Sequence, residues 1–116
     1  PLLDQAFRIV ADSGTTYSLP TLHCLKGELL LAEPTAGNAI EDSALTSFGA
    51  AASIARMQGS RAMEVRAMVG IVNGTSDVHQ RAAAVARLTS ILNYFQISDD
   101  SKDLVTALAI VEQHKR

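Results

Sequence analysis

The stretch NAIEDSALTSFGAAASIARMQG, residues 38–59, carries the apolar pattern that decides the fold. Its apolar side chains recur at steps of four, four, three and four, the spacing of one buried face of an α-helix. They are Ile40, Ala44, Phe48, Ala51 and Ala55. Asn38 and, three residues later, Glu41 resemble a capping box, which predicts that the helix begins there. Gly59 is expected to end it, because glycine readily adopts the left-handed conformation that closes many helices.

Two helices are predicted before this segment. The first covers residues 2–13 and should end at Gly14, because Leu3, Phe7 and Val10 recur at helical steps. The second is expected from about residue 19 to residue 32, with a proline tolerated in its first turn. Pro34 and the residues up to 38 then form a loop.

Three helices are predicted after it. Ser60 caps the first of them, which ends at the turn dipeptide Asn73-Gly74. Ser76 or Asp77 starts the next, whose buried stripe is Ala84, Leu88, Ile91 and Phe95. The last helix follows the oxygen-rich residues 98–100, and its buried stripe is Leu104, Leu108 and Val111. Six helices joined by short turns pack as antiparallel neighbours, so the chain is predicted to be all-α.

Composition limits the class of protein. The chain has 116 residues, enough for one domain with a single core, and 47% of them are hydrophobic. A formal charge of −2 gives no strong attraction for nucleic acid or anionic lipid. Cys24 is the single cysteine, so no disulfide can form within the chain and a four-cysteine zinc site is excluded. No apolar stretch approaches the roughly 20 residues that span a bilayer, so we expect a cytoplasmic protein.

The apolar pattern of the 38–59 helix recurs 40 residues later, which suggests an internal repeat. Together with a glycine in the middle of the preceding helix, this pattern resembles the tetratricopeptide repeat (TPR). Helix pairs of that repeat place small residues where the two helices touch. The matching residues, expected to pack the repeats together, are Gly27, Ala44, Phe48, Ala51, Ala84, Leu88 and Ile91.

Two further segments strengthen the resemblance. LKGELLL at residues 25–31 and ARMQGSR at residues 55–61 are similar to segments in the TPR regions of large bacterial regulators. Those regulators are predicted signal-transduction ATPases fused to winged-helix transcription factors or to adenylate cyclases. The resemblance implies that residues 1–116 form one TPR-like domain, an α-α superhelix of hairpins, and are a fragment from the carboxy-terminal part of such a chain. One departure is Val72, which stands where the fourth helix should carry a small residue.

The resemblance also implies a binding surface. In such a stack the first helix of each pair lines the concave face. Partner contacts are therefore expected from Thr21, Cys24, Glu28, Arg66, Val69 and Asn73. The expected partner is a protein segment or a sister domain of the same polypeptide, bound without catalysis. Direct binding to nucleic acid or to a membrane is not expected.

Motifs for chemistry are weak in this sequence. The acidic run at residues 99–103 matches a metal-diphosphate motif, but its position favours the start of a helix. His23 beside Cys24 is a poor metal pair, because adjacent helical residues point about 100° apart. We therefore predict a regulatory, non-enzymatic module with no cofactor and no metal site. The alternatives are a bare packing groove, a small stand-alone helical bundle that binds a ligand, and a homodimerisation domain.

Overall fold

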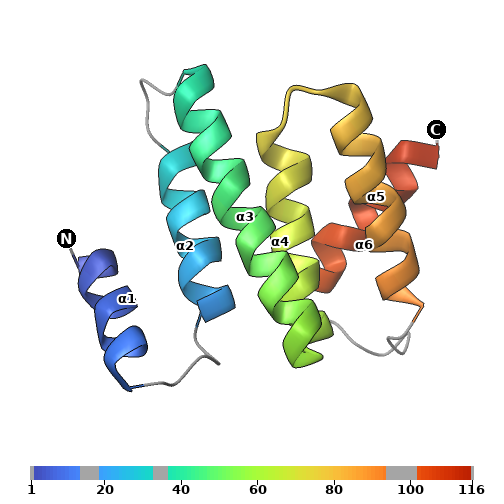
Figure 1. Cartoon of the computed structure of the whole chain (residues 1–116). Coiled ribbons are helices and arrows are strands. Elements are labelled where there is room, and N and C mark those ends of the chain that lie inside the picture. Colours follow the sequence, from blue (N-terminus) through green and yellow to red (C-terminus); the bar gives the residue numbers. More distant parts are fainter. Residues whose placement is uncertain (1, 14–18, 33–36, 94–101, 116) are drawn as a thin grey trace.

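The chain forms six helices in the described residues, 2–13, 19–32, 37–93 and 102–115, of a computed structural model (Figure 1). They are α1 (Leu2–Ser13), α2 (Leu19–Leu31), α3 (Asn38–Gln58), α4 (Arg61–Gly74), α5 (Val78–Leu92) and α6 (Lys102–Lys115). These residues contain no strand, which confirms the all-α prediction. The predictions made for Gly14, Pro34, Phe95 and residues 98–100 lie outside the described residues, as does the side chain of Val10.

The helix ends show which local signals operate. Gly59 closes α3 in the left-handed conformation, with φ 73°. The Asp77 side chain caps α5 by accepting from the backbone N–H of His79 at 2.8 Å. Ser60 occupies the N-cap position of α4 without a side-chain cap bond.

The capping box predicted at the start of α3 is wrong. Extended backbone at Gly37 makes this residue the N-cap, and its carbonyl accepts from the Glu41 N–H at 2.9 Å. The Glu41 carboxylate instead accepts from the Ser76 hydroxyl at 3.1 Å. The helix thus begins one residue before the expected position, and its acidic side chain is used in a tertiary contact.

The helices form two rows. Successive helices from α1 to α5 run in alternating directions (Figure 1). α2 contacts both α3 and α4, and α4 contacts both α5 and α6. Within the described residues the backbones of α3 and α5 stay further apart, with no Cα of one within 8 Å of a Cα of the other. α2, α4 and α6 therefore lie along one side of the molecule, which we call the α2/α4/α6 face.

The core is built around Phe48, which is fully buried. A Cβ added at Gly27 of α2 would lie 2.7 Å from its ring, and a Cβ at Gly70 of α4 only 2.3 Å. Two glycines thus allow α2 and α4 to approach the aromatic side chain of α3. The resemblance placed the small residue of this helix at position 72, where Val72 departs from it; the close approach on α4 is made by Gly70, two residues earlier.

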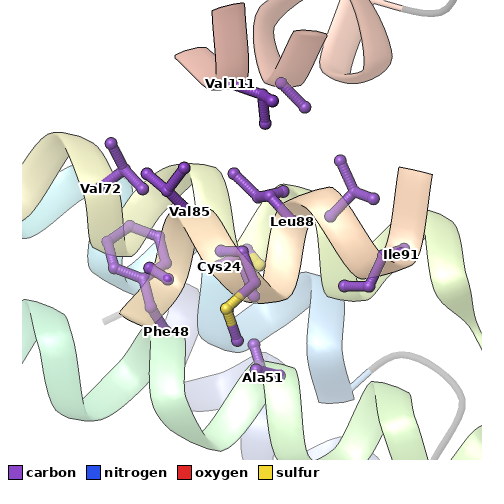
Figure 2. Close-up of a cluster of buried hydrophobic side chains, with 14 of the residues drawn as sticks. Cys24, Phe48, Ala51, Val72, Val85, Leu88, Ile91 and Val111 are labelled. Atoms are coloured by element: carbon purple, nitrogen blue, oxygen red, sulfur yellow. The ribbon is translucent and has the colours of Figure 1, made fainter. Parts of the chain in front are cut away.

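All seven predicted packing residues are buried, which agrees with their expected structural role. Figure 2 shows Phe48, Ala51, Leu88 and Ile91 in the same cluster as Val111, which comes from α6. The stripe predicted for α6 is partly wrong, because Leu108 is 54% exposed and Ala107 is buried. α6 packs against both α4 and α5, which turns the Leu104, Ala107 and Val111 side inward.

Candidate functional site

The α2/α4/α6 face carries a two-bond ion pair between Glu28 of α2 and Arg66 of α4. Arg66 Nη2 donates to Glu28 Oε1 at 2.7 Å, and Nε donates to Oε2 at 3.1 Å. This geometry matches the flat fork of a guanidinium to a carboxylate. The hydrogen bonds that Arg66 donates to Glu28, the charge of Glu28 and the nearby charge of Asp103 of α6 raise the pKa of Arg66. All three helices thus contribute a charged group to one small area.

The ion pair remains accessible to a partner. Its side chains are 23% exposed at Arg66 and 43% exposed at Glu28. Water screens such a pair, so its contribution to the free energy of unfolding is about 0.2–1 kcal/mol.

Cys24 cannot take the partner-binding role expected of it, because its side chain is fully buried. It belongs to the core cluster together with Phe48. Burial is the largest of the effects that raise the pKa of the thiol to about 11. The charge of Arg66 lowers this pKa, and the charges of Glu28 and Asp103 raise it. Cys24 lies one turn before Glu28 on α2, but Cys24 is buried and Glu28 is exposed. Residues four apart can differ in exposure here because α2 packs against both α3 and α4. Cys24 is a packing residue beneath the α2/α4/α6 face.

The other expected contact residues have mixed exposure. Thr21 is partly buried, and its hydroxyl lies 3.8 Å from Met63 Sδ in a weak donor contact that links α2 to α4. Val69 is partly buried and packs against the core. Asn73 is exposed at the end of α4. Glu28, Arg66 and Asn73 are thus the expected residues that combine exposure with a polar group.

A hollow of about 410 Å³ begins at Asn73 and lies between α4, α5 and α6. The residues that line it are Val72, Asn73, Arg81, Val85, Ile110, Gln113 and His114. Arg81 Nη2 donates to the Thr75 carbonyl at 2.7 Å, and Nε to the Val72 carbonyl at 3.4 Å. Sequence reasoning missed this hollow because three helices contribute to it and no local motif marks it.

A buried carboxylate at Glu64 was also missed. Its side chain is 3% exposed and accepts from Arg56 Nη2 at 2.8 Å and from Arg87 Nε at 2.7 Å. Burial alone would raise its pKa, but the hydrogen bonds and charges of Arg87 and Arg56 outweigh burial and lower it. This cluster ties α3, α4 and α5 together. The spacing of the three residues along the chain gave no sign of it.

No group of three His, Cys, Asp or Glu side chains that could hold a metal ion occurs in the part of the chain that the structure describes. The His23 ring packs against the Phe7 ring of α1, with centroids 4.7 Å apart, and burial followed by the charge of Lys26 lowers its pKa. None of the helices, over their described residues, has the length and apolarity needed to cross a membrane.

No protein-family model, curated protein or solved structure matches this chain. The resemblance to tetratricopeptide regions therefore stays a prediction from the segments that carry it.

Proposed function

We propose that this chain is a non-catalytic, TPR-like helical-repeat module. It forms the carboxy-terminal part of a bacterial transcriptional or signalling regulator. It binds a protein segment or a sister domain of the same polypeptide through the α2/α4/α6 face. Binding there favours one position of an attached output domain over another, which is how a module without chemistry can regulate.

The observation that carries this proposal is the charged row across three helices. Glu28, Arg66 and Asp103 come from α2, α4 and α6, and the first two hold each other in fixed, half-accessible positions. Side chains that are already ordered lose little conformational entropy on binding. A partner segment with a basic group beside an acidic one would match the two acids and the arginine.

The alternation of contacts supports the repeat reading. α2 contacts α4 and α4 contacts α6, whereas α3 and α5 each pack against the helices next to them in the chain. The close approach of α2 and α4 to Phe48 through two glycines fits the use of small residues between stacked helices. A hairpin of two amphipathic helices cannot bury its face alone, so it must stack on another.

Charge reversal with a swap control tests the surface. Peptides selected from a displayed library of random segments are titrated into labelled chain, and the affected backbone amides are mapped by NMR. We expect the shifts to concentrate on α2, α4 and α6. Glu28→Arg and Arg66→Glu should each weaken binding about tenfold or more, whereas Asp42→Arg, at an exposed position of α3, should leave it unchanged.

The double variant E28R/R66E separates recognition from support. It restores an opposite-charge pair between α2 and α4, so the free energy of unfolding should return to the wild-type value while peptide binding stays weak. Full recovery of binding in the swap would show that the pair only supports the fold, and shifts centred on α3 and α5 would place the partner elsewhere. A concentration-dependent dimer that these reversals dissociate would instead favour the homodimerisation alternative.

A further inference from the structure

The hollow between α4, α5 and α6 has the size of a small-molecule site. Its volume of about 410 Å³ falls within the range of roughly 300–1,000 Å³ that such sites occupy. Asn73 of α4 is one of its lining residues, and Glu28 and Arg66 are not among the described residues that line it. A ligand there would not need the charged row that the proposed function uses.

The lining divides into an apolar part and a polar part. Val72 and Val85 belong to the buried core, and Ile110 packs against it. Asn73, Gln113 and His114 are exposed polar residues at the ends of α4 and α6. A ligand that fits this lining has a compact branched or cyclic carbon body and one polar end.

The charge of the lining selects the polar end. Arg81 and His114 contribute to the hollow, and the described residues that line it include no Asp or Glu, although the chain as a whole carries a formal charge of −2. The imidazole can offer an N–H donor in either protonation state. An anionic group is therefore favoured over a cationic one.

Arg81 is held in place before any ligand arrives. Its Nε and Nη2 donate to two backbone carbonyls at the end of α4, and its Nη1 makes no hydrogen bond within the described residues. A guanidinium fixed in this way keeps donors for a planar oxyanion without a further ordering cost. One such arginine next to three branched aliphatic side chains fits a singly charged carboxylate on an apolar body.

We propose that this hollow binds a small apolar carboxylic acid in its carboxylate form. Arg81 holds the carboxylate, Asn73 and His114 donate to it from the rim, and Val72, Val85 and Ile110 contact the carbon body. Neither the charged row nor any TPR-like character is needed for this site. Its success or failure is thus separate from that of the protein-binding surface.

Cyclohexanecarboxylate and 4-methylpentanoate are the probes, each paired with its primary amide. Titration of the labelled chain is followed by NMR. We expect saturable shifts at Asn73, Arg81 and His114 for both acids, and binding of the amides that is weaker by about tenfold or more. Equal binding of acid and amide, or no saturable shifts at these residues, would overturn the proposal.

Two variants and one control assign the effect to the hollow. Arg81→Gln should weaken binding of the acids to the level of the amides. Arg81 also donates to a backbone carbonyl after α4, so Arg81→Gln could change the fold as well as the site. Gln113→Trp provides a second test at an exposed position, where the larger indole side chain should block the hollow without entering the core. Arg8→Gln removes an exposed arginine of α1, outside the hollow, and should leave the affinity unchanged. Acid binding that survives both Arg81→Gln and Gln113→Trp, or that is lost in Arg8→Gln, would refute the assignment.

Discussion

The contact between Gly70 and Phe48 gives the sharpest test of the packing. Gly70→Ala adds one methyl group whose position lies 2.3 Å from Phe48 Cε1, 2.5 Å from Cδ1 and 2.6 Å from Cζ. These distances are far below the van der Waals contact of about 3.5–4.0 Å between carbons. Phe48 is fully buried, so the ring cannot move aside into solvent. A Cβ built at Gly27 of α2 would lie 2.7–2.9 Å from the same ring, so the backbone of α2 also passes close to the ring and limits movement in that direction.

Two opposing terms set the size of the effect. Alanine in place of glycine within a helix is favourable by about 0.5–1 kcal/mol, because the unfolded chain loses freedom. Adding a methyl group to a filled core costs about 1–3 kcal/mol. For Gly70→Ala we expect net destabilisation of about 1–2 kcal/mol.

Gly49 provides a matched control, since it lies within α3 and a Cβ there has nothing within 4 Å. Gly49→Ala should stabilise the chain by about 0.5–1 kcal/mol.

Urea unfolding followed by circular dichroism measures both variants. The double variant G70A/F48L should be less destabilised than the sum of its single changes, because leucine removes ring atoms that the new methyl group would meet. If Gly70→Ala stabilised the chain as much as Gly49→Ala, Phe48 could not lie against Gly70 and the described core would be wrong. Strict additivity in the double variant would also contradict the contact.

Three further predictions test other parts of the structure. Glu64→Gln should lower the free energy of unfolding at pH 7 by about 1–3 kcal/mol by weakening the bonds from Arg56 and Arg87, as measured by urea unfolding. The pKa of Glu64 is lowered from 4.5 in the folded chain, so its contribution to the free energy of unfolding is present above pH 4.5 and is lost as the pH falls through the folded pKa. The free energy of unfolding of Glu64→Gln should therefore depend less on pH in acid than that of the unchanged chain. With a pKa raised from 9.0 to about 11, Cys24 should hold roughly a hundredfold less thiolate than an ordinary thiol and react with a disulfide reagent only after unfolding; rapid labelling of the native chain would contradict its burial. Ala44→Leu should destabilise the fully buried position by about 1–3 kcal/mol through overpacking, and an unchanged unfolding midpoint would argue against this core.

The helices themselves follow from the sequence, because the signals that make them are local. Gly59 ends α3 and Asp77 caps α5 as expected, since both act on backbone groups within a few residues. The apolar steps of the 38–59 segment correctly place Ala44, Phe48 and Ala51 in the core. Such a pattern follows from the geometry of a single helix and does not depend on which helix packs against it.

The tertiary structure decided which side of each helix meets which neighbour. Adjacent residues lie about 100° apart around a helix, so the rotation of α6 about its axis, set by α4 and α5, decides that Ala107 and not Leu108 faces the core. The same dependence on neighbours placed Gly70 rather than Val72 against Phe48.

The candidate sites show the same division. Glu28 and Arg66 were expected on one face, but their pairing across 38 positions arises only when α2 and α4 pack together. The burial of Cys24 and the hollow around Arg81 likewise depend on how the helices pack. The sequence by itself determined the helices, the ends marked by Gly59 and Asp77, and most of the buried stripes. The distances and rotations between helices depend on side-chain volumes from distant parts of the chain, and these decided which polar groups meet.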